Sequence, residues 1–155
     1  MSVNVSPRMF RRDDFAARML QLAGSAGVEP GRLRIEINEA SLLDDPVAVA
    51  AALQRLRDGG IEAILDDFGV GSSSLAFAQR FPLRLVKLDR AFLARYAGIP
   101  SGRGREVLAA VFDLARSLEL EMLAEGVETE DQRGMLQGLG CRYGQGYLFG
   151  RARPL

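Results

Sequence analysis

Six short runs with the composition of β-strands alternate along this chain with longer stretches of helical periodicity, and this alternation limits the fold more than any other feature. The runs are SVNVS, LRIEI, EAILD, LVKLD, EMLAE and YGQGYLF. Strands that are separated by helices pair in parallel through right-handed crossovers. The sequence therefore predicts an α/β fold, which is either an open doubly wound sheet or a (β/α) barrel.

Helices are expected between these runs, at about residues 13–26, 46–58, 73–80, 103–117 and 130–139. Three local signals support the boundaries. Asp45 before Pro46 and Thr129 before Glu130 have the pattern of helix N-caps, and the pair at 59–60 is two glycines, which suit a helix end. The loop 97–104 is expected at the surface. Because no linker or low-complexity tract interrupts the chain, residues 1–155 are predicted to form one domain.

The composition excludes several classes of function. Lys plus Arg and Asp plus Glu each number 20, and the pI is near 6.3, so no overall positive field favours generic nucleic-acid or membrane-surface binding. No segment approaches the ~18 apolar residues of a membrane helix, and the N-terminus lacks a signal pattern. A single cysteine, Cys141, excludes an internal disulfide, and these features together predict a cytoplasmic protein. Histidine is absent, so a catalytic site must use carboxylates, amides and lysine.

Polar residues occur at or near the ends of the predicted strands, where α/β proteins collect their functional groups. They are Asn4, Glu36, Asp66, Asp67, Lys87, Glu125 and Gln145. A buried carboxylate without compensation costs several kcal/mol unless it is paired, protonated or bound to metal. Carboxylate and amide oxygens are hard ligands, and an adjacent acidic pair can serve two ions. We therefore expect a site for two Mg²⁺ or Mn²⁺ ions.

Six motifs in this chain resemble, in order and in spacing, those of EAL domains, which hydrolyse the bacterial second messenger cyclic di-GMP. The motifs are VNVSPRMF, RLRIEINEASLL, ILDDFGVGSSSL, LVKLDRAF, LAEGVET and GQGYLF. The resemblance implies a modified TIM-like (β/α) barrel with one strand reversed. It also implies two-metal hydrolysis of one phosphodiester bond of cyclic di-GMP, which gives linear pGpG.

The same resemblance implies a role for each matching residue. The implied metal ligands are Asn4, Glu36, Asp66, Asp67 and Glu125. Glu125 is also implied in catalysis, together with Lys87, which would hold or deprotonate the attacking water. The residues implied in substrate or loop support are Glu39, Glu128, Gln145, Gly69, Gly71 and Ser73. Of these, Glu39 would anchor the loop that follows Asp67.

The first two strands of the family, with the Glu-Ala-Leu stretch and a further metal-ligating Glu, would lie upstream of Met1. A complete barrel takes about 250 residues, so the 155 residues are expected to be the C-terminal two-thirds of an EAL domain, with about six of eight strands. We therefore expect impaired hydrolysis by this chain and self-association, as a homodimer, over its uncovered edges. An upstream sensory or diguanylate cyclase domain is a further expectation from the family.

Simpler explanations exist for individual residues. Asn4 could close a turn, Asp66 with Asp67 could cap a helix, and Lys87 could form a surface ion pair with Asp89. Two other functions are also compatible with parts of the pattern. A receiver domain would need a third Asp on an intervening strand and a longer interval to its Lys, so it is disfavoured. A catalytically silent EAL relative that binds cyclic di-GMP or a protein partner remains the main alternative.

Overall fold

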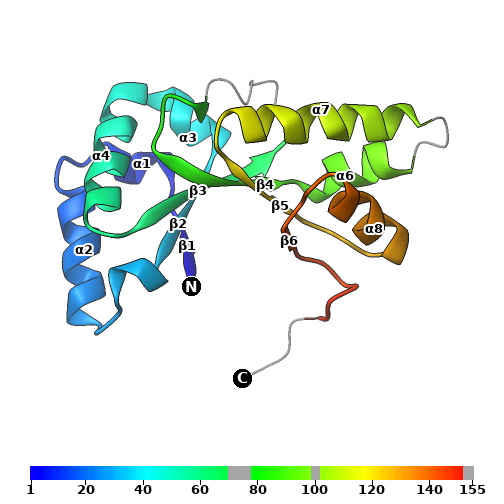
Figure 1. Cartoon of the computed structure of the whole chain (residues 1–155). Helices are drawn as coiled ribbons and strands as arrows, with labels where there is room; N and C mark the ends of the chain where they lie inside the picture. Colours follow the sequence, from blue (N-terminus) through cyan, green and yellow to red (C-terminus); the bar gives the residue numbers. More distant parts are fainter. Residues whose placement is uncertain (70–77, 99–101, 152–155) are drawn as a thin grey trace. The chain divides into compact units, whose positions relative to one another are not determined.

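A computed structural model describes residues 1–69, 78–98 and 102–151 (Figure 1). Contacts within the chain divide it into two compact units. The described residues of unit 1 are 1–66 and 78–84, and those of unit 2 are 67–69, 85–98 and 102–151. One boundary falls between Asp66 and Asp67, inside the acidic pair. The two units are therefore considered separately, and the prediction of one domain over 1–155 stays a prediction.

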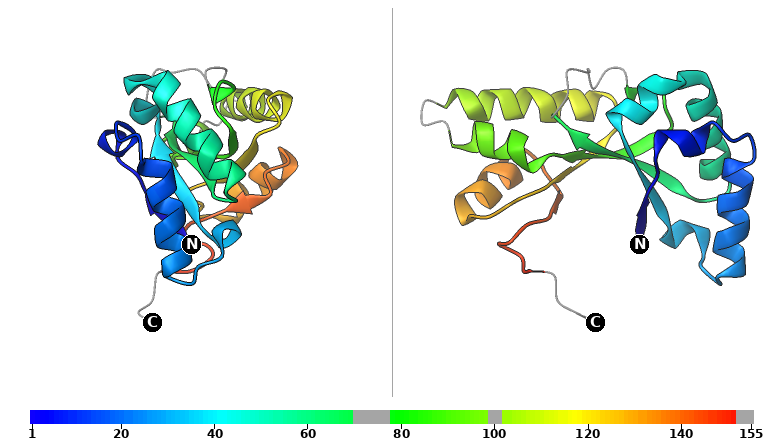
Figure 2. Two further views of the ribbon diagram at one scale, coloured as in Figure 1. Left: turned by 90° about the vertical axis from the view of Figure 1, so that its left-hand side faces the viewer. Right: turned by 180° about the vertical axis from the view of Figure 1, so that it is seen from behind.

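Unit 1 alternates parallel strands with helices. Its elements are β1 (Ser2–Asn4), α1 (Pro7–Phe10), α2 (Phe15–Ser25), the 3₁₀ helix η1 (Pro30–Arg32), β2 (Arg34–Asn38), α3 (Glu39–Asp44), α4 (Pro46–Asp58) and β3 (Glu62–Phe68), of which the last two residues belong to unit 2. β2 pairs in parallel with both β1 and β3. Helices α2 and α4 pack side by side (Figure 2). Ile35 and Ile37 of β2 are fully buried, as is Leu56 of α4, so they form the core of this unit.

Unit 2 repeats the same alternation. Its elements are β4 (Leu83–Leu88, of which the first two residues belong to unit 1), α6 (Arg90–Ala97), α7 (Arg103–Ser117), β5 (Glu121–Ala124), α8 (Glu130–Gly138) and β6 (Tyr143–Gly144). β5 pairs in parallel with β4 and with β6. Val86, Leu88 and Ala124 are fully buried in the core, together with Leu108 of α7.

The six strands found in the described residues, all paired in parallel where their register is known, confirm the predicted α/β class. The helix signals are confirmed as well. The Asp45 carboxylate accepts a hydrogen bond from the N–H of Ala48 at 3.0 Å. Thr129 forms a capping box with Gln132, and Gly60 follows α4 with a φ of +88°. None of the described helices has both the length and the apolar character that crossing a membrane requires.

Some expected elements differ from those observed. The run YGQGYLF forms a strand of only 2 residues, because Gly146 packs directly on the backbone of Val127 and the chain turns there. The short helices α1, α3 and α6 were not predicted, since elements of 4, 6 and 8 residues give too few turns for a clear periodicity. The predicted helix 73–80 lies mostly outside the described residues. The surface loop 97–104 lies partly outside them, and α7 already begins at Arg103.

Candidate functional site

Three of the predicted metal ligands lie on one face of the strands of unit 1. The parallel register aligns Asn4 with Glu36 and Glu36 with Ile64, and Asp66 follows Ile64 by two residues. Aligned partners in neighbouring strands project to the same side, as do residues two apart in one strand. Asn4, Glu36 and Asp66 therefore share a face, while the buried Ile35 and Ile37 lie on the opposite one.

Asp67 has a backbone conformation that the sequence did not reveal. Its φ is +57°, in the left-handed region that few residues other than glycine adopt, although Asp tolerates it better than most. In a regular strand, Asp66 and Asp67 would point to opposite faces. The left-handed residue interrupts this alternation, as bulges do near active sites. Both aspartates lie within β3 itself.

Lys87 and Glu125 form a close ion pair in unit 2. Lys87 Nζ lies 2.8 Å from Glu125 Oε1, Lys87 is only 9% exposed, and the Glu125 side chain is 21% exposed. Lys87 is in β4, and Glu125 directly follows β5. The N–H of Glu125 donates to the carbonyl of Leu88 in β4 at 3.0 Å, which extends the pairing of the two strands by one hydrogen bond. Removing one member of a buried pair leaves a charge without compensation, which costs about 3–5 kcal/mol.

This geometry contradicts the alternative of a surface pair between Lys87 and Asp89, because Lys87 is buried. Asp89 instead caps α6, where its carboxylate accepts a hydrogen bond from the N–H of Ala91 at 2.7 Å. Lys87 and Asp89, although only two positions apart in the sequence, therefore interact with different partners. Lys87 pairs with Glu125, and Asp89 fixes the start of a helix.

A groove of about 300 Å³ lies beside this ion pair, within unit 2. Its lining includes three residues that the sequence predicted for the site, which are Glu125, Glu128 and Gln145. The N–H of Gln145 donates to the Ala124 carbonyl at 2.8 Å, so the pairing of β5 with β6 continues beyond the short strand. Arg90 and Tyr147 also line the groove. Both lie inside motifs that resemble those of the family, LVKLDRAF and GQGYLF, but neither was assigned a role there.

The remaining support residues are only partly described. Glu39 is the first residue of α3, where a carboxylate interacts favourably with the helix N-terminus, and Asn38 caps this helix through its side chain. The loop that Glu39 would anchor lies outside the described residues, as do Gly71 and Ser73. Gly69 is described and has a φ of +100°, which requires glycine.

The donor set has the chemistry that Mg²⁺ or Mn²⁺ would require. The implied ligands are carboxylates and one amide, so every donor is a hard oxygen atom. Within residues 1–69, 78–98 and 102–151, however, no group of 3 or more acidic, His or Cys side chains is arranged to hold a metal ion. The residues thus fit the ion chemically, and their ligation of it stays a prediction.

A tight contact beside Gln145 yields a first prediction, on stability. A methyl group at Gly146 would overlap with the backbone N and O atoms of Val127, which cannot move aside as a side chain could. We expect Gly146→Ala to lower the free energy of unfolding by about 1–3 kcal/mol. Gly134→Ala in α8 is the matched control, because no atom lies within 4 Å of the added methyl. This control should gain about 0.5–1 kcal/mol. Equal urea midpoints for the two variants would contradict the expectation.

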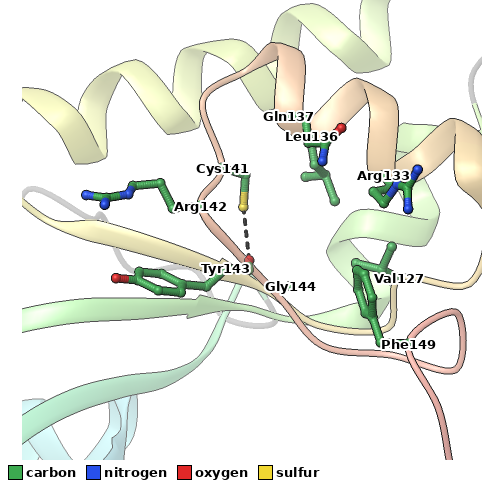
Figure 3. Close-up of a pocket in the computed structure, with 9 residues that line it drawn as sticks. All are labelled: Val127, Arg133, Leu136, Gln137, Cys141, Arg142, Tyr143, Gly144 and Phe149. Carbon is green, nitrogen blue, oxygen red and sulfur yellow. Dashed lines mark hydrogen bonds between the residues drawn. The ribbon is translucent and has the colours of Figure 1, made fainter.

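A second cavity, of about 270 Å³, lies beside α8 and β6 (Figure 3). Val127, Leu136 and Phe149 contribute apolar surface, and Arg133 and Arg142 contribute cations. The Cys141 thiol donates to the Tyr143 carbonyl at 3.2 Å in this cavity (Figure 3). None of the residues predicted for the site lines it. The groove beside Glu125 is therefore the better candidate.

The second prediction concerns Cys141. Burial raises the pKa of its thiol above the ordinary value of 9.0. At pH 8, iodoacetamide should therefore alkylate the folded chain more slowly than the chain unfolded in urea, because the thiolate is the nucleophile. A raised pKa contributes stability that is complete below pH 9.0 and is lost as the pH rises through the higher folded value. Equal alkylation rates in the two states would exclude this environment for the thiol.

Comparison with known proteins places these features in a family. The sequence profile of the EAL domain matches residues 1–152. The chain is 36% identical over 154 residues to the cyclic di-GMP phosphodiesterase RocR of Pseudomonas aeruginosa, covering 99% of this chain and 39% of RocR. It is 40% identical over 131 residues to the cyclic di-GMP phosphodiesterase NbdA of the same organism, covering 84% of this chain and 16% of NbdA. The chain thus spans well under half the length of these relatives.

Solved structures of EAL phosphodiesterases are similar to this chain as well. A complex of the PaMucR phosphodiesterase with c-di-GMP is similar, with a TM-score of 0.87 and 34% identity, covering 99% of this chain and 61% of that one. BlrP1 of Klebsiella pneumoniae, in a manganese and c-di-GMP complex, has a TM-score of 0.85 and 30% identity, covering 97% of this chain and 38% of BlrP1. These similarities confirm the predicted fold class, an EAL-type barrel of which this chain contains part.

Proposed function

The chain belongs to the EAL domain family, and from this premise we propose that it takes part in the metal-dependent hydrolysis of cyclic di-GMP to linear pGpG. The observation that carries the proposal is the buried ion pair of Lys87 with Glu125 at 2.8 Å, beside the groove lined by Glu128 and Gln145. Relatives named as cyclic di-GMP phosphodiesterases support the substrate. The cytoplasm is the proposed place of action, as expected from the composition.

The residues of the chain would divide the work as follows. The residues that the family resemblance implies as metal ligands, Asn4, Glu36, Asp66, Asp67 and Glu125, would hold the ions by their oxygen atoms. Two divalent ions, when bound, would acidify a water molecule and neutralise the charge on the phosphodiester. Lys87, which Glu125 holds in place, would orient the attacking water through its ammonium group or, as the neutral amine, accept the proton of that water. Positioning of this kind contributes to catalysis because the entropy cost of orienting the reacting groups has already been met when the protein folds and binds its substrate.

For a polypeptide of only these 155 residues, we propose that hydrolysis is impaired. The family resemblance implies one more metal-ligating Glu, on a strand that precedes the first motif matched here. The match with this chain covers 61% of the PaMucR chain, so the PaMucR chain is longer than the matched segment. Two-metal catalysis requires every ligand to be held closely, so an incomplete set should weaken metal binding first. Homodimer formation and an upstream sensory or diguanylate cyclase domain belong to the same proposal.

A silent module that binds cyclic di-GMP without cleaving it is the second candidate. It is the main alternative from the sequence, because the further metal-ligating Glu that the family resemblance implies is not in the six motifs matched here. Binding and cleavage should be measured on the same sample, once with Mn²⁺ and once with a chelator. Cleavage that requires Mn²⁺ would support the enzyme. Binding that is equal under both conditions, without any product, would support the silent module instead.

A further inference from the structure

The first turn of α6 packs against two glycines that directly follow proposed site residues, all within unit 2. Gly69 lies two residues after Asp67, and Gly126 lies directly after Glu125. Both glycines have positive φ values, +100° and +68°. A methyl group at Gly69 would overlap with the ring of Phe92, and one at Gly126 would overlap with the aliphatic stem of Arg90. The side chains of Phe92 and Arg90, in one helical turn, thus cover the backbone next to Asp67 and the backbone next to Glu125.

Hydrogen bonds tie the same turn to both strand ends. The N–H of Asp89 donates to the carbonyl of Phe68 at 3.0 Å, and the carbonyl of Leu88 accepts from the N–H of Glu125 at 3.0 Å. The peptide group that joins Leu88 to Asp89 therefore bonds to the end of β3 through its N–H and to the residue that follows β5 through its carbonyl. The Asp89 side chain also caps α6, so the orientation of the helix is coupled to these two bonds.

The packing side chains are themselves held in place. The ring of Phe92 lies 6.4 Å from that of Phe68 and 4.7 Å from that of Tyr96. Leu93, in the same turn, is fully buried. Aromatic pairs at such distances stabilise each other beyond the area that they bury. The first turn of α6 is therefore anchored to the core while it presses on both glycines.

We propose that Arg90 and Phe92 are positioning residues, which hold the backbones of Glu125 and Asp67 from the first turn of α6. Their contribution to catalysis rests on the proposed function. Their mechanical role, which is to hold these two backbones in place, does not depend on it. Arg90 would act through its aliphatic stem, because the stem is the part that lies over Gly126. Phe92 would act through its ring. Loss of either side chain should free the adjacent strand end while leaving the rest of unit 2 folded.

Hydrogen exchange of the 155-residue chain tests this role without any metal or substrate. In Phe92→Ala the amide of Asp89, and in Arg90→Ala the amide of Glu125, should exchange at least about tenfold faster than in the parent chain. The amides of Leu118 and Leu139, which close α7 and α8, serve as internal references and should keep their rates. Arg90→Met should restore slow exchange at Glu125, since it keeps the stem and removes the charge. Arg95→Ala, an exposed arginine of the same helix, is the matched control and should change neither amide.

Unchanged exchange at both amides, or acceleration that is uniform over unit 2, would overturn the proposal. A titration with Mn²⁺ provides the second readout. If the carboxylates bind the ion, Phe92→Ala and Arg90→Ala should weaken its binding by about 10- to 100-fold, the usual effect of removing groups that orient metal ligands. Full Mn²⁺ affinity in both variants would refute the positioning role. A parent chain that binds no Mn²⁺, but whose variants show the local exchange, would leave the mechanical role intact. It would refute the proposed function if the chain preceded by the first two strands of an EAL relative also bound no Mn²⁺.

Discussion

Replacing Lys87 by alanine should lower kcat for cyclic di-GMP hydrolysis by about 10²- to 10⁴-fold, with little change in KM, because a positioned acid–base group contributes to this extent. The measurement requires what we call the extended chain, which is this chain preceded by the first two strands of an EAL relative. Lys87 lies 2.8 Å from Glu125 and is 9% exposed, so its ammonium group is held in one place. Initial rates at several substrate concentrations separate kcat from KM.

The controls for Lys87 must separate chemistry from folding. Loss of the lysine leaves Glu125 without this partner and should destabilise the fold by about 3–5 kcal/mol. Rates should therefore be compared well below the melting temperature of the variant, and Lys87→Met should be included because it keeps the stem. Arg84→Ala, on the same strand but with a side chain that is 62% exposed, should leave kcat unchanged. An increase in KM alone would reassign Lys87 to a contact with the phosphate.

Divalent ions should stabilise the folded extended chain if the carboxylates bind them. At a free Mn²⁺ concentration 100 times the dissociation constant, mass action adds about 2.7 kcal/mol to the free energy of unfolding. For a chain of this size the corresponding rise in melting temperature is roughly 5–10 °C. Mg²⁺ should act in the same direction. Calorimetric scans with and without the ion provide the measurement.

Substitutions identify the carboxylates responsible for this stabilisation. Asp66→Asn and Glu36→Gln should abolish most of the rise, because each removes a charged ligand from the shared face of β2 and β3. Asp113→Asn, at an exposed carboxylate on α7, should retain it in full. The metal-site hypothesis would fail if Mn²⁺, Mg²⁺ and Ca²⁺ all left the melting temperature of the unsubstituted extended chain unchanged.

The strand positions and the helix caps could be predicted because they depend on local patterns. Runs with the composition of β-strands identified the strands of Glu36 and Lys87, and the capping pattern at Thr129 was sufficient to place the start of α8. The rule that polar groups collect at strand ends also placed Gln145 beside Glu125 in one groove. Each of these inferences used only neighbours in the sequence or the parallel order of the strands.

Other features could not be predicted, because they arise from contacts between residues far apart in the sequence. The left-handed conformation of Asp67 has no sequence signal, since aspartate usually adopts other conformations. The burial of Lys87 and its pairing with Glu125 depend on the 37 residues that lie between them in the sequence. The contacts of Phe92 with Gly69 and of Arg90 with Gly126 likewise appear only when the helix is placed. Glycines at such positions resemble ordinary turn residues when only the sequence is known.

The proposed function assigns the hydrolysis of cyclic di-GMP to these carboxylates and Lys87, acting with divalent ions. Its most direct test is the identification by mass spectrometry of the product formed from cyclic di-GMP by the extended chain with Mg²⁺ or Mn²⁺, with the 155-residue polypeptide assayed beside it. We expect linear pGpG from the extended chain, none after chelation or in Glu125→Gln, and little from the shorter polypeptide. Intact cyclic di-GMP in every sample of the folded extended chain, with either ion present, would contradict this expectation.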